Sequence, residues 1–570
     1  MKKKDCNYYL LPRTDKFLNE FISEEDERVK WLTGFSGSFA FVIVSLKQNA
    51  VFTDGRYISQ IKKQVDQKNY EVFNIHKKDP ISWLNERIKR KEKILIDSWL
   101  FTCKDFNHIK KVIEKKKSQI LLSKEIFIDK IWKKKRKKNN KVFIREEKYS
   151  GVSFKKKIKV VKKILNKKKI NNFFFSSPES ISWLLNIRSN CIKYTPVALS
   201  FLLLNLNDKS FFFETKNVNL EKYLGPYFST FNINDLKEVL IYFSITNKEI
   251  YLDPSKTAYF IEDFFRTIGV EVKYTEDPCL NLKTIKNSVE IKGSKDSHIR
   301  DGVSVCKFLF WLDEEIKKKK KITELTTSKK LFDFRKKNKL FRGLSFETIS
   351  GFGSNGSIVH YRVSKNSNKT FKKNNLYLFD SGAQYLDGTT DITRTISIGD
   401  DPTDEQRNMF TRVLKGNIGL NNYNFTERTM GKVLDKIARK YLKKKYDYPH
   451  GTGHGVGNYL SVHEGPITIS KKSTTKFKKG MILTNEPGFY KINEYGIRIE
   501  NVLLVIKKNK FLGFEILTFA PIDTKLIETK LLNIQEKKWI NAYHRKVYDK
   551  INKFLEKKEV EWLKEKTLPI

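Results

Sequence analysis

An internal repeat limits the fold of this chain more than any other feature of its sequence. Residues 29–57 and 181–215 each contain Trp-Leu, a short polar loop, a strongly apolar segment, a polar turn and a second apolar segment. Short apolar segments bounded by turns are typical of buried strands. Trp31 and Trp183 lie 152 residues apart, a period that indicates repeated domains rather than a solenoid. We therefore expect two similar α/β domains at the start of the chain, each with its tryptophan anchored in the core.

The repeat also sets the domain boundaries. A lysine-rich stretch, 130–141, follows the first copy and places a boundary near residue 147. The last half of the chain mixes helix and strand signals, as expected for an α+β domain. We predict domains at 1–147, 148–287 and 288–570.

Helix signals are clearest in the third domain. Apolar residues recur at helical spacing in the last twenty residues of 284–316 and again in 323–337, where Thr323 is a candidate N-cap. Thr403 and Gln406 have the spacing of a capping box. An apolar stripe also runs along the C-terminal tail, at Trp539, Tyr543, Val547, Ile551, Phe554 and Leu555. Spacings of three and four predict a helix that packs against its own domain.

The formal charge of +47 raises the question of nucleic-acid binding. The lysines are spread along the whole chain, however, and Lys, Asn, Ile and Phe are abundant together, as in proteins from A/T-rich genomes. We interpret lysine clusters such as 130–141 and 316–322 as solvated surface. We therefore expect no specific nucleic-acid partner.

Cysteine usage and hydropathy indicate the compartment. The five cysteines contain no Cys-x-x-Cys pair, which argues against a disulfide framework and fits a reducing environment. The first apolar run, "YYLL", is too short for a signal peptide, and no segment approaches the ~18 apolar residues of a membrane span. We expect a cytoplasmic protein with no membrane partner.

Three aspartates fall within "DSGAQYLDGTTDITRT", residues 380–395. The run before Asp380 reads as an apolar strand, and a second, alternating strand starts at Asp391. An Asp-Gly turn signal joins them, so Asp380 and Asp391 should lie side by side at one end of a sheet. Asp387 belongs to the turn, where aspartate caps its own backbone, and we interpret it as structural.

Histidines and glutamates follow in similar settings. His360, His450, His454 and His463 each lie near glycine or turn residues, which allow another group to approach closely. Glu486 ends an apolar run, and the stretch 497–505 reads as a strand that places Arg498 and Glu500 on one face. Together with the two aspartates, these residues suggest one pooled site.

Four carboxylates can share a site as anions only if a positive charge offsets their repulsion. One or two divalent cations would provide it. The set of four carboxylates and one imidazole is too acidic for structural zinc and suits Mn²⁺ or Co²⁺. Two such cations can hold a hydroxide between them for hydrolysis.

At this point the sequence resembles a known family. The motifs are "FETISGFGSNGSIVHY", "DSGAQYLDGTTDITRT", "HGTGHGVGNYLSVHEGP", "NEPGFY" and "GIRIEN", in that order, with "TGFSGS" and "FTDGRY" near the start. They resemble those of the Xaa-Pro aminopeptidases of the methionine-aminopeptidase and creatinase superfamily, in their long three-domain form. The resemblance covers nearly the whole chain. It implies two creatinase-like α/β domains followed by a catalytic domain of the pita-bread fold.

The resemblance assigns roles residue by residue. It implies that two divalent metal ions are bound by Asp380, Asp391, His454, Glu486 and Glu500. Asp391 and Glu500 would bridge the ions; Mn²⁺ is the favoured metal, with Co²⁺ or Zn²⁺ as alternatives. His360, His450 and His463 would be further active-site residues.

The implied reaction is hydrolysis of the first peptide bond of peptides with proline in second position, by a hydroxide that bridges the metals. Glu486 would carry the proton to the leaving nitrogen, and Arg498 would orient carboxylates from behind. The resemblance also implies a homodimer joined through the catalytic domain.

Two alternatives remain open from the sequence. One is an Xaa-Pro dipeptidase, although three domains and the motifs "DSGAQY" and "VHEGP" favour the enzyme for longer peptides. The other is a non-catalytic binding protein of the same fold, although such relatives lose ligands that are intact here.

Overall fold

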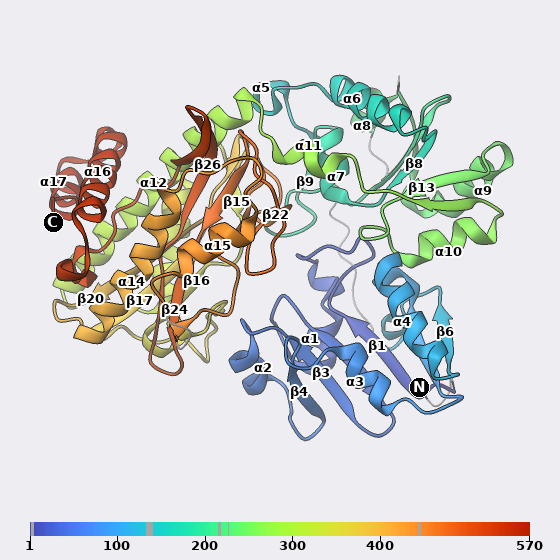
Figure 1. Cartoon of the computed structure of the whole chain (residues 1–570), viewed down its shortest axis with the longest axis horizontal. Coiled ribbons are helices and arrows are strands. Elements are labelled where there is room, and N and C mark those ends of the chain that lie inside the picture. Colours follow the sequence, from blue (N-terminus) through green and yellow to red (C-terminus); the bar gives the residue numbers. More distant parts are fainter. Residues whose placement is uncertain (2–4, 133–140, 215–217, 226, 443–445) are drawn as a thin grey trace. The chain divides into compact units, whose positions relative to one another are not determined.

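The computed structural model describes residues 1–570 except 2–4, 133–140, 215–217, 226 and 443–445. Most of the lysine-rich stretch 130–141 therefore lies outside the described residues. The chain forms two compact units, one from 1–146 and 152–280 and the other from 147–151 and 281–570 (Figure 1). Across the described part of the chain, no helix combines the length and the apolar character that a membrane crossing requires.

The first unit contains two six-stranded sheets. One has the order β4-β3-β2-β1-β5-β6 and the other β12-β11-β10-β8-β13-β14. In both, the three central strands pair antiparallel and the outer strands pair parallel. This identical topology confirms the predicted repeat of two α/β folds.

The elements of this unit have the following bounds. The strands of the two sheets are β1 (Tyr8–Pro12), β2 (Phe41–Ser45), β3 (Asn49–Thr53), β4 (Tyr70–Asn74), β5 (Lys93–Asp97), β6 (Gln119–Ser123), β8 (Asn172–Phe175), β10 (Phe201–Asn205), β11 (Ser210–Glu214), β12 (Phe228–Asn232), β13 (Glu249–Leu252) and β14 (Glu271–Tyr274); β7 (Val142–Ile144) pairs with β9 (Ile187–Ser189). The helices are α1 (Arg28–Thr33), α2 (Ile58–Gln64), α3 (Pro80–Arg87), α4 (Cys103–Lys115), α6 (Phe154–Lys167), α7 (Pro178–Leu184), α8 (Val218–Leu224), α9 (Leu236–Thr246) and α10 (Tyr259–Thr267). The short helices α5 (Glu147–Ser150) and α11 (Cys279–Thr284) lie at the passages between the units.

The prediction that both tryptophans anchor a core is wrong for Trp31. Its side chain is 43% exposed and stacks on Trp132, with 5.8 Å between ring centroids. Helix α1 is short and buries Val29 against the sheet, so Trp31, two residues further on, points away from the core. Trp183 is half-buried, with the Lys157 ammonium 4.4 Å from its ring centroid.

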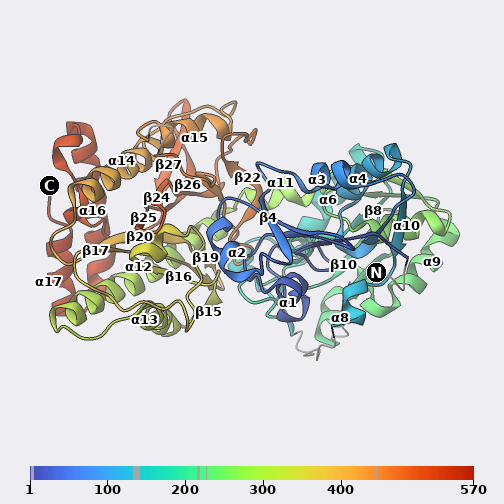
Figure 2. The same ribbon diagram turned by 90° about the horizontal axis from the view of Figure 1, so that it is seen from below.

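The second unit places strands between two layers of helices (Figure 2). Helices α12 (Ser288–Lys317) and α13 (Glu324–Lys336) pack against the first strands, and α14 (Asp404–Asn421) and α15 (Gly431–Arg439) pack against the later ones. Those strands are β15 (Phe341–Leu344), β16 (Ile349–Phe352), β17 (Asn375–Ser381), β18 (Ala383–Tyr385), β19 (Gly388–Thr389), β20 (Ile392–Ile398), β21 (Gly453–Gly455), β22 (Glu464–Ile469), β23 (Ile482–Asn485), β24 (Gly488–Lys491), β25 (Tyr495–Arg498), β26 (Asn501–Lys508) and β27 (Phe511–Ile516). This helix-and-strand architecture confirms the predicted α+β domain.

Local sequence determines where these helices begin. The side chain of Thr323 accepts a hydrogen bond from the Thr326 amide at the start of α13, as predicted. The predicted capping box of Thr403 and Gln406 is also present at the start of α14. Helix α12 begins earlier than expected, because Asn287 and Glu290 form a further capping box. The lysines at 317–321, at and beyond the end of α12, are exposed, as predicted.

The tail forms α16 (Ile534–Ile551) and α17 (Lys557–Lys566), both packed against α12. Tyr543, Val547 and Ile551 of the predicted stripe are buried in the core of this domain. The prediction is wrong for Phe554, which is 50% exposed, because α16 ends at Ile551 and the chain changes direction there. The tail therefore closes the core of its own domain.

We expect buried His544 to make stability depend on pH. Its Nε2 accepts a hydrogen bond from the Ile522 amide (3.1 Å), so the fold holds the neutral ring. Burial, assisted by the nearby Arg394 cation, lowers the pKa of His544 from 6.5 to about 4. Protonation is thus easier in the unfolded chain, and stability falls as pH drops from about 6.5 to about 4, by about 3 kcal/mol.

Calorimetry between pH 7 and pH 4.5 measures this effect. His544→Gln keeps an acceptor for the Ile522 amide but does not titrate, so its melting temperature should fall less steeply on acidification than that of the wild type. Parallel curves for the two proteins would exclude His544 as the cause.

Candidate metal centre

Strands β17 and β20 position the two aspartates. They pair antiparallel, with Asp380 opposite Thr393 and Ser381 opposite Ile392. Asp391 immediately precedes β20, and both aspartates are buried. The predicted strand pair, with its two acids at one end, is confirmed, but the Asp-Gly turn joins the intervening strands β18 and β19.

Asp387 lies in the tight turn between β18 and β19. Its carboxylate forms an ion pair with Arg300 of α12. Its backbone oxygen accepts a hydrogen bond from Asn458 Nδ2 (2.7 Å). These contacts attach the turn to its neighbours and direct the Asp387 side chain to α12.

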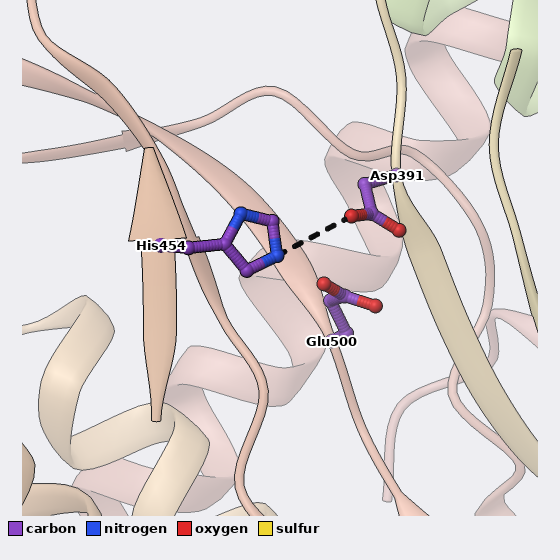
Figure 3. Close-up of side chains that lie close together, drawn as sticks. All are labelled: Asp391, His454 and Glu500. Atoms are coloured by element: carbon purple, nitrogen blue, oxygen red, sulfur yellow. Dashed lines mark ion pairs between the residues drawn. The ribbon is translucent and has the colours of Figure 1, made fainter. Parts of the chain in front are cut away.

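Asp391, His454 and Glu500 form a compact group (Figure 3). One ligand atom of each lies within 4.8 Å of the others. His454 Nε2 is 3.7 Å from Asp391 Oδ2. The three residues come from the start of β20, from β21 and from the segment between β25 and β26, so the group joins both halves of the domain.

The segment that carries Glu500 differs from the prediction. The prediction of a single strand over 497–505 is wrong, because the structure has two strands there. β25 pairs with β24 and β26 pairs with β23, so the strand is interrupted at Ile499 and Glu500, where the chain passes from one sheet to the other. Arg498 and Glu500 still lie on the same side, because both hydrogen-bond the Thr393 hydroxyl. Arg498 Nε donates to the Thr393 hydroxyl (3.2 Å), which in turn donates to Glu500 Oε2 (2.7 Å).

Glu486, His450 and His463 adjoin this group, whereas His360 does not belong to it. Glu486 directly follows β23, and its Oε1 is 3.5 Å from His454 Nε2. His450 Nδ1 is 3.9 Å from the other oxygen, Oε2. The ring of His463 meets that of His454 edge-on, with centroids 4.4 Å apart. His360 is half-buried and is not one of the three residues of the compact group.

Arg498 holds Asp380. Its Nη2 donates to Asp380 Oδ2 (2.6 Å), and the arginine is 1% exposed, so it is not a surface residue. Its Nη1 donates to the hydroxyl of Tyr490 (2.6 Å), which also contacts His450 Nε2 (2.8 Å). The sequence reasoning missed Tyr490, since one tyrosine in a short strand has no spacing that marks it.

The electrostatics of the site favour cations. Burial and the carboxylates of neighbouring residues raise the pKa of Asp391 and of Glu500 well above their ordinary values. Burial also raises the pKa of Glu486 to about 7, although Arg498 acts in the opposite direction. Asp380 Oδ1 and Asp391 Oδ1 are buried and have no hydrogen-bond partner among the described residues. Buried carboxylate oxygens without donors are suited to divalent metal ions.

Comparison with known proteins agrees with this geometry. Residues 295–507 match the model of metallopeptidase family M24, and 510–570 match the C-terminal region of that peptidase. Over 100% of its length the chain is 37% identical to a protein of Coprinopsis cinerea named "Probable Xaa-Pro aminopeptidase P", of which it covers 97%. The chain belongs to metallopeptidase family M24.

Structures of M24 relatives confirm the predicted fold class. An X-prolyl aminopeptidase from Caenorhabditis elegans, described as a cytosolic enzyme with a di-nuclear active site, is 32% identical, with a TM-score of 0.94 over 99% of this chain and 95% of that one. Residues 1–126 and 133–290 each match a creatinase/prolidase N-terminal domain. This chain therefore consists of two creatinase-like domains followed by a catalytic domain of the pita-bread fold.

A second comparison separates fold from function. The Xaa-Pro dipeptidase of Bacillus anthracis is 23% identical, with a TM-score of 0.52 over 65% of this chain and 99% of that one. At this identity, the similarity between the dipeptidase and the present chain concerns the fold alone.

Proposed function

We propose that this protein is an Xaa-Pro aminopeptidase, a hydrolase that removes the first residue from peptides with proline in second position. The observation that carries the proposal is the buried group of Asp391, His454 and Glu500, adjoined by Glu486. Its support is the full-length similarity to proteins of that name. A non-catalytic binding protein would not need to retain buried, mutually repelling carboxylates.

Two divalent metal ions complete the proposed site. Asp380, Asp391, His454, Glu486 and Glu500 would hold them, with Asp391 and Glu500 shared between the two ions and Mn²⁺ as the proposed metal. Such ions polarise a carbonyl group and lower the pKa of water toward neutrality. The raised pKa values of Asp391 and Glu500 support this assignment, since cations would relieve the repulsion that raises them.

Proton transfer falls to Glu486. Its carboxylate lies 3.5 Å from His454 Nε2, at the edge of the group, where it would accept a proton and donate it to the leaving proline nitrogen. His450 hydrogen-bonds the Gly451 carbonyl (2.7 Å) and the Tyr490 hydroxyl (2.8 Å), so we assign it to orienting the groups beside Glu486. We assign His463 and His360 to hydrogen bonds with the substrate backbone and the developing oxyanion. Arg498 would orient the Asp380 carboxylate through the 2.6 Å contact.

Peptide length separates this function from the dipeptidase alternative. Purified protein with Mn²⁺ should release the first residue from an Xaa-Pro-Yaa peptide and leave the matched Xaa-Ala-Yaa peptide intact. Faster cleavage of the Xaa-Pro dipeptide than of the tripeptide would favour the dipeptidase. Inactivity on all three peptides would remove the peptidase proposal.

We further propose a cytosolic homodimer, since the similar C. elegans enzyme is described as cytosolic and the resemblance implies pairing through the catalytic domain. An isologous interface buries the same surface on both copies. Light scattering at micromolar concentration should give twice the mass of one chain, 67.1 kDa. A single-chain mass in a fully active sample would contradict the dimer.

A further inference from the structure

The break in the strand at Glu500 leaves its peptide groups outside the sheet ladder, and residues of β20 take their place. The Glu500 amide donates to the Thr393 carbonyl (3.1 Å), and its carboxylate accepts from the Thr393 hydroxyl (2.7 Å). The Glu500 carbonyl accepts from Arg394 Nη1 (2.7 Å). Two consecutive residues therefore fix both the backbone and the side chain of Glu500.

Arg394 connects this segment to the C-terminal tail. Its guanidinium is 1% exposed and donates from all three nitrogens. The acceptors are four peptide carbonyls, one amide and one phenol, belonging to Thr393, Glu500, Ala520, Pro521, Asn501 and Tyr543. The guanidinium has five N–H groups for these six acceptors, and three acceptors share Nη2: Tyr543 (2.7 Å), Asn501 (3.0 Å) and Ala520 (3.1 Å). The Tyr543 hydroxyl is the nearest of the three, so its loss should turn Nη2 toward the other two and shift the fork.

Tyr543 is the acceptor that comes from helix α16. Its hydroxyl accepts from Arg394 Nη2 (2.7 Å) and donates to the Ala520 carbonyl (2.8 Å). The next residue, His544, accepts from the Ile522 amide (3.1 Å). Helix α16 thus holds the segment 520–522 and Arg394 together, and Arg394 holds Glu500.

We infer that Tyr543 and Arg394 are positioning residues for Glu500, so that the C-terminal helix sets the metal affinity of a site to which it contributes no ligand. The inference rests on the proposed metal-dependent function. Loss of a group that hydrogen-bonds a metal ligand and orients it typically lowers metal affinity by about 10- to 100-fold. Tyr543 lies at the weaker end of that range, because it acts through Arg394.

The test is Tyr543→Phe in the full-length protein. The substitution removes only the hydroxyl, and the ring can keep its stacking on Trp539, with centroids 5.4 Å apart. Titration calorimetry of the metal-free protein with Mn²⁺ should show affinity reduced by about 10-fold. Arg394→Lys, which keeps the charge but loses the fork, should reduce it further.

Val547→Ala is the matched control. Val547 lies in α16, is fully buried and packs in the same core, so its truncation loosens the helix without touching Arg394. It should lower the melting temperature and leave Mn²⁺ affinity unchanged.

The outcomes are distinct. Wild-type affinity in Tyr543→Phe, or an equal loss in Val547→Ala, would overturn the inference for the helix. Wild-type affinity in Arg394→Lys would overturn it for Arg394. The proposed function stands in each case. A wild-type protein that takes up no Mn²⁺ would instead overturn the proposed function itself.

Discussion

Asp391→Asn is expected to lower kcat/KM by more than about 100-fold and to reduce bound metal, since a ligand contributes more than the groups that orient it. Asp391 is buried, lies 3.7 Å from His454 and belongs to the group with Glu500. The amide keeps the shape of the side chain but removes the negative charge that a divalent cation needs. Metal content by elemental analysis, together with peptide cleavage rates, measures both effects.

Asp387→Asn is the control for that experiment. It makes the same chemical change four residues earlier in the chain, but its partner is Arg300 of α12 rather than the carboxylate group. The ion pair is partly exposed, so we expect a loss of at most about 1 kcal/mol in stability and unchanged metal content. A loss of metal equal to that of Asp391→Asn would show that the aspartates are wrongly assigned.

Local signals explain what the sequence could predict. The alternation after Asp391 predicts β20, and the Asp-Gly signal predicts a tight turn, because both depend on neighbouring residues only; that turn joins β18 and β19. The helix starts at Thr323 and Thr403 follow from a hydroxyl and its partner three residues on. The two similar sheets of the first unit could be predicted because the same short sequence pattern occurs twice.

Features that depend on distant partners were not predictable in this way. The break at Glu500 arises because β25 and β26 join different sheets, while the residues themselves continue a strand-like run. Tyr490 gains its place from Arg498 in the paired strand β25 and from His450, which lies 40 residues earlier in the chain. Trp31 is exposed because α1 buries a different face. In each case tertiary pairing decides, and no local pattern encodes it.

Metal removal is expected to abolish activity and to lower the melting temperature of the protein. Without cations the site contains buried carboxylates that repel one another, as the raised pKa values of Asp391 and Glu500 indicate. A cation that binds only the folded state stabilises it by about 2.7 kcal/mol at 100 times its dissociation constant. Dialysis against a chelator, followed by Mn²⁺ addition, should therefore lower and then restore both the activity and the melting temperature.

The dependence on Mn²⁺ concentration distinguishes site binding from general ion effects. Tenfold more free Mn²⁺ should add about 1.4 kcal/mol for each ion whose site is nearly full, because stabilisation grows with the logarithm of ligand concentration. Asp391→Asn should show little of this response, whereas Asp387→Asn should respond like the wild type. Ca²⁺ at the same concentration controls for ionic strength, since it prefers more oxygen ligands and no imidazole. A melting temperature insensitive to Mn²⁺ in the wild type, or an equal response in Asp391→Asn, would contradict metal binding at this group of residues.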